Sequence, residues 1–224
     1  MNKLKRMLVV MAHPDDIEIG CYGLIKKLVL RGAVCYVAIA TNGENGLNIS
    51  DNKKNILNRK EETQNALGCL VEDIIWLGYP DGHMKLDANY VGSIRRVIDE
   101  VSPELIVTHF PDDSGIEHQD HGIVGKGTIN AAFRYAKTLK YLLLSEPMFN
   151  YMTNFKPNLF VDISDVYDDK LQALKQHISQ RKKFYMSDYF QNIRSSAITP
   201  YINMPNIDSE KKYELFQIMY ERFG

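Results

Sequence analysis

The sequence predicts an α/β protein of the Rossmann-like, three-layer type, in which a mostly parallel sheet carries helices on both faces. Short apolar runs alternate with amphipathic stretches along most of the 224 residues, the order expected of strand–helix units joined by right-handed crossovers. The run at 7–12 is apolar throughout, as in a strand covered on both faces. At 45% hydrophobic and 25% charged residues, the chain can bury the core of a single domain spanning 1–224. We expect its core at about 5–180 and a C-terminal elaboration at about 181–224.

Strands and helices alternate at regular spacing. Short apolar runs place the strands, in order, at 7–12, 34–40, 73–77, 105–108, 141–144 and 159–163. Amphipathic stretches place the helices, in order, at 18–31, 54–67, 89–101, 122–138, 165–180 and roughly 208–222. Gly32 and Gly68 end the first two helices, and Pro103 separates the third from the strand after it. Residues 181–206 lose the alternation and mix aromatic, basic and polar side chains.

Composition and charge exclude several classes of partner. The formal net charge is −1, so no strong field attracts nucleic acid or an anionic membrane, and a small-molecule substrate is expected. The three cysteines, Cys21, Cys35 and Cys69, include no CxxC pair, which favours a reducing compartment. The apolar run after the basic N-terminus breaks at His13, too early for a signal peptide, and no run approaches the roughly 20 residues of a membrane span. We therefore expect a cytoplasmic protein without stable membrane association.

Four side chains that can bind a metal or move a proton follow the first strand directly: His13, Asp15, Asp16 and Glu18. In a parallel sheet this position lies at the carboxyl edge, where binding sites form. His13 and Asp16 are three residues apart, so a first helical turn would bring them to one side, with Asp15 directed elsewhere. Adjacent carboxylates repel each other unless a cation lies beside them. The simpler interpretation, that the acids only complement the dipole of the next helix, leaves His13 unexplained.

A second cluster follows the fourth strand, at the same edge of the sheet. His118 and His121 are three residues apart and flank Asp120, so one helical turn would bring both imidazoles together. Alone, such a pair is common at solvated helix starts. With His13 and Asp16, one of the two histidines would complete a three-ligand set with an open position, as in catalytic zinc sites. The other histidine, held by Asp120, would be free to stabilise an oxyanion or give a proton.

Two motifs carry a family resemblance: Ala12-His13-Pro14-Asp15-Asp16-Ile17-Glu18 and His118-Gln119-Asp120-His121. With them, the chain resembles the PIG-L/LmbE-like family of zinc N-deacetylases, which includes the deacetylases of N-acetylglucosaminyl-phosphatidylinositol, mycothiol and bacillithiol biosynthesis. The resemblance extends over residues 7 to about 180. Weaker matches lie at 59–62 with 66–68, at 77–82, at 177–180 and, weakest, at 213–216. Ile19 and Tyr22 stand where the family usually has small or simple apolar residues.

The resemblance implies a role for each residue of the two motifs. The implied metal ligands are His13, Asp16 and His121. Asp15 would be the general base, and His118 the oxyanion-stabilising or proton-donating group, oriented by Asp120. The implied metal is zinc, although a site of two histidines and one aspartate also accepts iron(II). Self-association is expected because family members often associate.

Further residues have a functional and a structural interpretation. Arg59 is expected to bind a substrate hydroxyl or carboxylate, the alternative being a surface ion pair with Glu62. His177 is also assigned to substrate binding, although the direction of its side chain cannot be read from the sequence. His109 is either a support for the metal ligands or a rim histidine. Asp81 lies between proline and glycine and is interpreted as a turn residue.

These assignments predict metal-assisted hydrolysis that removes an N-acetyl group from an amino sugar or its conjugate, with Asp15 taking a proton from the attacking water. Two other functions fit part of the pattern. A phosphohydrolase of similar topology would use magnesium, which prefers oxygen ligands to histidine nitrogen. A non-catalytic sugar-binding module would be expected to lose Asp15 or a ligand, and none is missing. An N-acetylhexosamine conjugate, a thiol-cofactor precursor and a nucleotide sugar remain open as substrates.

Overall fold

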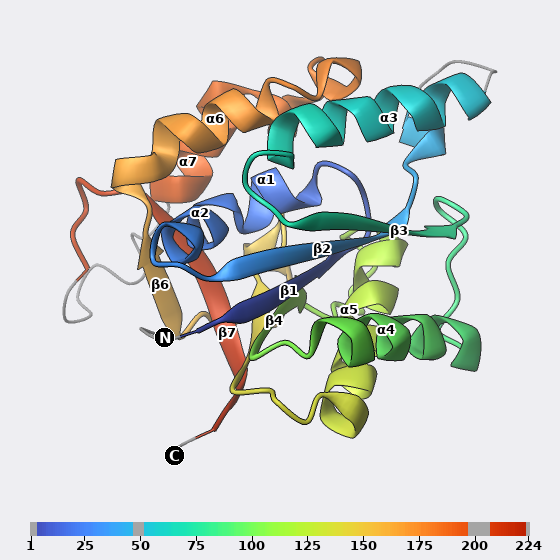
Figure 1. Ribbon diagram of the computed structural model, residues 1–224. Coiled ribbons are helices and arrows are strands. Elements are labelled where there is room, and N and C mark those ends of the chain that lie inside the picture. Colours follow the sequence, from blue (N-terminus) through green and yellow to red (C-terminus); the bar gives the residue numbers. More distant parts are fainter. Residues whose placement is uncertain (1–3, 47–51, 197–206, 223–224) are drawn as a thin grey trace.

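The computed structural model describes residues 4–46, 52–196 and 207–222. They contain a seven-stranded sheet of strand order β3-β2-β1-β4-β5-β7-β6 (Figure 1). Along the chain the strands are β1 (Arg6–Met11), β2 (Val34–Thr41), β3 (Asp73–Tyr79), β4 (Leu105–His109), β5 (Tyr141–Ser145), β6 (Leu159–Asp162) and β7 (Tyr213–Glu221). β1 to β5 pair in parallel, and β7 is antiparallel to both β5 and β6. The predicted mostly parallel sheet is confirmed.

Helices cover both faces of this sheet (Figure 1). One face is covered by α1 (Asp16–Gly20), α2 (Tyr22–Leu30), α3 (Asn52–Leu67) and α6 (Tyr167–Leu174). The other face is covered by α4 (Ala88–Val101) and α5 (Gln119–Tyr135). A further helix, α7 (Asp188–Ser196), contacts β7. The three-layer arrangement expected from the alternation of strands and helices is therefore present.

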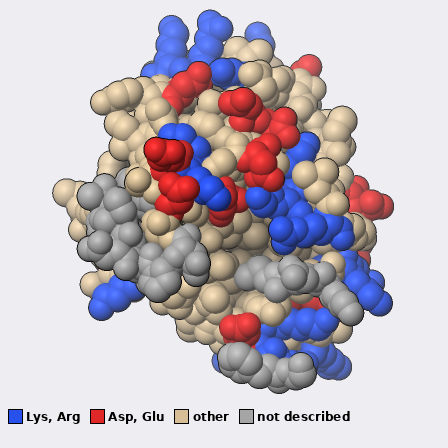
Figure 2. Space-filling model, turned by 90° about the vertical axis from the view of Figure 1, so that its left-hand side faces the viewer, with Lys and Arg blue, Asp and Glu red and all other residues tan. Residues whose placement is uncertain are grey.

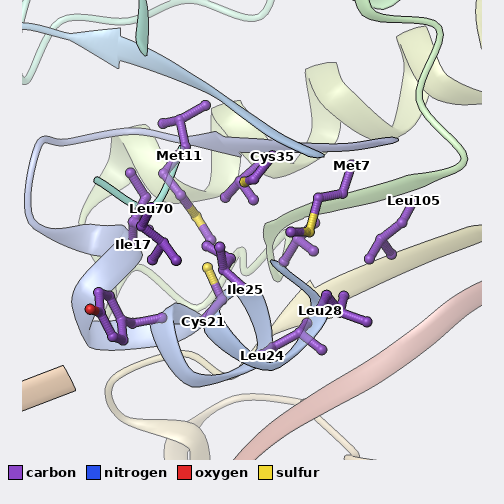
Figure 3. Close-up of a cluster of buried hydrophobic side chains, with 14 of the residues drawn as sticks. Met7, Met11, Ile17, Cys21, Leu24, Ile25, Leu28, Cys35, Leu70 and Leu105 are labelled. Atoms are coloured by element: carbon purple, nitrogen blue, oxygen red, sulfur yellow. The ribbon is translucent and has the colours of Figure 1, made fainter. Parts of the chain in front are cut away.

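The core beneath α1 and α2 is built from side chains of both helices and of the central strands (Figure 3). Met7 and Met11 of β1 are fully buried there, together with Ile17 and Ile25. Burial of each such side chain contributes about 1.5–3 kcal/mol. Cys21 also lies in this cluster, where burial raises the pKa of its thiol well above the ordinary value. Its side chain is therefore protonated core packing and not a nucleophile.

The C-terminal segment departs from the prediction. A helix was expected at about 208–222, but the structure has the strand β7, which lies between β5 and β6. Leu215 and Phe216 are 1% and 0% exposed because both faces of this strand are covered. A strand buried on both faces shows no clean alternation, so its apolar residues also match a helical period. Of the segment predicted to be an elaboration, about 181–224, residues 213–221 belong to the sheet.

Two other helices have different limits from those predicted. The helix expected at 18–31 is two helices, because the backbone at Cys21 leaves the helical conformation (φ −151°) between α1 and α2. The helix expected at 165–180 ends at Leu174, and His177 lies in the turn that follows. A short 3₁₀ turn, Ile178–Gln180, then leads back toward the sheet edge. The second change matters for the site, because it determines where His177 and Gln180 point.

A buried ion pair joins β7 to the helical layer above it. Lys170 of α6 and Glu214 of β7 are 2% and 3% exposed, with Lys170 Nζ 2.8 Å from Glu214 Oε1. The Glu214 carboxylate also accepts the backbone N–H groups of Gly23 and Leu24 at 2.9 and 2.8 Å. These two N–H groups belong to the first turn of α2, where an anion is favoured by the helix dipole. The pair therefore connects three elements that are distant in sequence.

Charges of both signs are mixed on one side of the molecule. Figure 2 shows the side of the molecule that lies at the left of Figure 1, where β6 is seen. On that side, Lys and Arg lie among Asp and Glu and do not form a continuous patch of one sign. No helix in the described part of the chain is long and apolar enough to cross a membrane.

Candidate active site

A pocket of about 290 Å³ opens at the carboxyl ends of the parallel strands. It lies at the switch point of the sheet, where the strand order changes direction. β1 has β2 as its neighbour on one side and β4 on the other. Loops that follow β1, β2, β3, β4 and β5 line it, together with residues from the turn at 180–185. Both clusters predicted from the sequence therefore meet in one pocket.

Three predicted ligands face one another there. His13 Nδ1 lies 3.2 Å from His121 Nε2 and 3.4 Å from Asp16 Oδ2. His121 Nε2 lies 3.4 Å from Asp16 Oδ1. A tetrahedral zinc ion with ligand bonds of about 2.0–2.2 Å would separate its ligands by roughly 3.3 Å, so these spacings fit one such ion. We call His13, Asp16 and His121 the ligand group. It provides two imidazole nitrogens and one carboxylate, and all three residues line the open pocket.

The electrostatics of this group also favour a cation. Burial opposes a charge on His121, yet Asp16 and Glu117 raise the pKa of this histidine to about 9. Burial likewise opposes a charge on His13, while Asp16 and Asp120 raise its pKa well above the ordinary value. Two rings whose nitrogens lie 3.2 Å apart cannot both direct a proton into that gap. A single divalent ion between the two rings would supply the positive charge that the neighbouring carboxylates favour.

The other nitrogen of His13 is held by two further carboxylates. His13 Nε2 lies 3.2 Å from Asp81 Oδ1 and 3.5 Å from Asp120 Oδ2. Asp81 also accepts the backbone N–H of Asn45, and Asp120 that of Gly82. His118 joins His13, Asp81 and Asp120 in a second group whose spacing would also fit a metal. Because Nδ1 of His13 belongs to the first group, we interpret the carboxylates at Nε2 as supports that orient this ring and raise its basicity.

His121 has a support of the same kind. Its Nδ1 lies 3.5 Å from Glu117 Oε2, on the ring edge away from Asp16. Its ring stacks on His109, with centroids 4.1 Å apart and an angle of 7° between the planes. Gly125 permits this approach of α5 to β4, because a Cβ there would lie 2.5 Å from the His109 carbonyl oxygen. His109 itself lies 3.1 Å from Asp16 Oδ2, so it contacts the ligand group, as one of its two interpretations anticipated.

Asp15 is kept apart from the ligand group by Arg59 of α3. Arg59 Nη2 lies 3.1 Å from Asp15 Oδ1, and the two side chains are 2% and 5% exposed. Burial acts against ionisation, but the guanidinium lowers the pKa of Asp15 below its ordinary value. Asp15 therefore stays a carboxylate that can accept a proton. The surface ion pair considered for Arg59 is replaced by this buried one, and Nε and Nη1 of Arg59 have no hydrogen-bond partner among the described residues.

His118 and Asp120 do not interact as predicted. The Nδ1 atom of His118 accepts the backbone N–H of Asp120 at 3.3 Å, so the imidazole caps the start of α5. The Asp120 carboxylate is 3.9 Å from that nitrogen and turns instead to Gly82 N–H and His13. Since Nδ1 is an acceptor, the proton of the neutral ring is on Nε2. Burial, with His13 and His121, lowers the pKa of His118.

The position of His177 does not match the predicted substrate contact. Its side chain is 0% exposed and is absent from the pocket lining. Nε2 of His177 lies 3.3 Å from Oε1 of Glu18, which is also fully buried. Glu18 thus points away from the ligand group and pairs with the turn after α6. The sequence could not give this direction, because it depends on where α6 ends.

Residues at the site that were not assigned from sequence include Glu117 and Asp81. Glu117 precedes His121 by four residues. This spacing places the two side chains beside each other only where the backbone makes a helical turn. Asp81 follows β3, the edge strand, and was interpreted as a turn residue. The position of Asp81 at the carboxyl end of a parallel strand was the sequence signal that could have placed it at the site.

Comparisons with known proteins show which family the chain resembles in sequence and fold. Residues 8–132 match the PIG-L family, described as GlcNAc-PI de-N-acetylase. A Bacillus subtilis (strain 168) protein named "Probable N-acetyl-alpha-D-glucosaminyl L-malate deacetylase 2" is 32% identical over 186 residues, which cover 79% of this chain and 83% of that protein. The N,N'-diacetylchitobiose deacetylase of Pyrococcus horikoshii, solved with an inhibitor, has a TM-score of 0.81 at 23% identity over 97% of this chain and 84% of that chain.

The fold by itself does not select one reaction. The 4-carboxy-2-hydroxymuconate hydratase GalB of Pseudomonas putida KT2440 matches with a TM-score of 0.82 at 19% identity over 98% of both chains. The assignment therefore depends on the matched sequence, which spans β1 to α5 and includes both ligand-bearing motifs. On that match, this chain belongs to the PIG-L family of deacetylases.

Proposed function

We propose that this protein is a metal-dependent hydrolase that removes an N-acetyl group from an amino sugar or an amino-sugar conjugate. The observation that carries the proposal is the group of His13, Asp16 and His121 in a pocket that ionised Asp15 also lines. The relatives support the substrate class, because their names describe deacetylases of N-acetylated sugars. Imidazole ligands favour zinc, or iron(II), over the magnesium of a phosphohydrolase.

The ligand group, Asp15 and Arg59 have different roles in the proposed reaction. A bound divalent ion would polarise the acyl carbonyl and make the attacking water more acidic. The carboxylate of Asp15 accepts the proton that this water loses, and Arg59 holds that carboxylate in place. The same proton can pass from Asp15 to the departing nitrogen as the C–N bond breaks, so that water and amide become a carboxylate and an amine. Arg59 also lines the pocket, which is why substrate binding remains its second proposed role.

His118 is assigned to the developing oxyanion. Its neutral ring carries the proton on Nε2, because Nδ1 accepts the N–H of Asp120. A lowered pKa keeps this ring neutral at neutral pH, which makes it a hydrogen-bond donor more than an acid. Of the two roles predicted from sequence, the hydrogen bonding therefore favours oxyanion stabilisation. Asp120, together with Asp81, is assigned to the orientation of His13.

The direct test measures the two products of the proposed reaction. Purified protein, supplied with zinc or iron(II), should release acetate and a primary amine from N-acetylglucosamine glycosides in equal amounts. A chelator should stop both, and added metal should restore them, since three protein ligands hold about one ion per chain. Release that continues unchanged after complete removal of the metal, or phosphate release from phosphorylated sugars in place of acetate, would disprove the proposal.

Variants of His118 and Asp120, which are two residues apart, separate the roles of these side chains. His118→Ala should keep its metal and lose turnover by roughly 10²-fold, the usual effect of removing one oxyanion donor. Asp120→Asn should instead weaken metal affinity by about 10- to 100-fold, because it removes a charge from the support of His13. Metal titrations and kcat at saturating metal measure both effects. Loss of metal in His118→Ala with recovery in excess zinc would assign His118 to the ligands.

A further inference from the structure

A buried amide side chain lines the pocket with its oxygen unpaired. Gln180 ends the 3₁₀ turn after α6, is 1% exposed and lines the same pocket as Asp15 and the ligand group. Its Nε2 atom donates to the Gly46 carbonyl at 3.3 Å and to the Ser179 hydroxyl oxygen at 3.0 Å. Its Oε1 atom accepts no hydrogen bond from the described residues. Buried polar atoms are nearly always paired, so this acceptor is suited to a donor that enters the pocket.

The neighbouring contacts fix which end of the Gln180 amide is the nitrogen. The Gly46 carbonyl can only accept, so the amide atom that faces it must be the donor. The Ser179 hydroxyl gives its single proton to Glu62 Oε2 at 2.7 Å, so toward Gln180 it can only accept. Exchange of the nitrogen and the oxygen would place two acceptors against each other at both contacts. The oxygen is therefore the end of this amide that is left for a ligand.

The amide is held in place by two walls of the pocket. Ser179 donates to Glu62 of α3 from its backbone N–H and from its hydroxyl, at 2.7 Å each, which fixes the turn that carries Gln180. Gly46, which accepts from the amide, belongs to the 3₁₀ turn Glu44–Gly46 after β2 and also lines the pocket. An acceptor that is oriented before a ligand binds loses little conformational freedom on binding.

We propose that Gln180 Oε1 accepts a hydrogen bond from a hydroxyl group on the sugar ring of the substrate, and so selects amino sugars from other acetamides. This inference rests on the proposed function. An acetamide N–H is common to every N-acetylated amine, whereas ring hydroxyls distinguish a sugar. Carboxylate acceptors at the site already face cationic partners, among them Asp15 with Arg59. A neutral amide oxygen suits a neutral hydroxyl, because neither group has the strong hydration of a charge to lose.

The selectivity arises from what an unsuitable substrate leaves unpaired. Before substrate binds, water in the pocket can donate to the Gln180 oxygen. A substrate that displaces this water without supplying a donor loses affinity, because it leaves a buried acceptor unpaired. One neutral hydrogen bond of this kind corresponds to roughly threefold to tenfold in kcat/KM.

The test removes one partner of the hydrogen bond at a time, from the sugar and from the protein. The substrates are the methyl glycoside of N-acetylglucosamine and its 3-, 4- and 6-deoxy analogues, each of which lacks one ring hydroxyl. With the metal-loaded protein, one deoxy analogue should lose roughly threefold to tenfold in kcat/KM. Gln180→Met, similar in length but without the acceptor, should reduce this loss to less than about twofold. Gln180→Ala is the second variant and should have the same effect.

A matched control and the comparison of ratios exclude a general disturbance of the pocket. Gln172→Met should keep the full loss, because Gln172 is an exposed residue of α6 that does not line the pocket. Structural damage caused by Gln180→Met would lower kcat/KM for all four glycosides and leave their ratios unchanged. A loss for a deoxy analogue that Gln180→Met and Gln180→Ala leave intact would overturn the contact, since the hydroxyl would then bind elsewhere.

Calorimetric binding of the same four glycosides separates this inference from the proposed function. Weaker binding of one deoxy analogue, seen only when Gln180 is present, would support the contact even without acetate release, and then only the proposed function would fail. Acetate release with equal kcat/KM and equal affinity for all four glycosides would overturn the contact alone.

Discussion

Asp15→Asn is expected to remain folded and metal-loaded while its turnover falls by a factor on the order of 10² to 10⁴. An amide has the shape of the carboxylate but cannot accept the proton of the attacking water. Its oxygen can still accept the hydrogen bond that Arg59 Nη2 now donates to Asp15 Oδ1, so the buried guanidinium keeps a partner. Turnover and metal content are measured on the same preparation, the first by acetate release and the second by elemental analysis.

Asp16→Asn is the control variant for Asp15→Asn, because it should lose metal and not only turnover. Asp16 contacts both ligand nitrogens and accepts the backbone N–H of His13 at 2.7 Å, so its substitution should reduce metal affinity first. Activity lost through this change should return, at least in part, when metal is added in excess. If Asp15→Asn and Asp16→Asn lost metal to the same extent, the division of the two adjacent carboxylates into base and ligand would be wrong.

The largest expected effect on stability is that of Glu214→Ala, which should lower the free energy of unfolding by about 3–5 kcal/mol. The substitution leaves Lys170 as an unpaired charge that is 2% exposed. It also removes the acceptor of two backbone N–H groups at the start of α2. Urea denaturation followed by circular dichroism measures the loss, provided that the transition of the unsubstituted protein is two-state.

Two controls test whether burial of the ion pair causes the expected loss of stability in Glu214→Ala. Lys211→Ala breaks an ion pair with Asp162 in which the side chains are 47% and 35% exposed, and should lower the stability far less, because water screens an exposed pair. The double variant Lys170→Met with Glu214→Leu should lose less than the sum of the two single changes, because no charge is left buried. A Glu214→Ala variant as stable as Lys211→Ala would show that the buried pair does not hold β7 in place.

The ligand group could be proposed from sequence because its members lie in two short motifs, one directly after β1 and the other at the start of α5, beyond the loop that follows β4. The rule that parallel strands end at a common edge brought His13 and Asp16 together with the pair His118 and His121. Only the family resemblance selected His121 from that pair as the expected ligand. The partner of Asp120 was not predictable. His118 lies two residues before it in sequence, yet the Asp120 carboxylate turns to His13, because the backbone N–H groups after β3 lie on that side. The direction of a side chain within one turn depends on what packs against that turn.

The sequence by itself determined the parallel sheet, the helices on both faces and the two motifs that meet at its edge. Apolar periodicity and local spacing express these features, because they arise from hydrogen bonds and side-chain faces within each element. Only the tertiary structure decided that residues 213–221 form a strand between β5 and β6, that His177 is buried against Glu18, and that Gln180 lines the pocket. Each of these depends on contacts between segments far apart along the chain, whose partners local patterns do not encode.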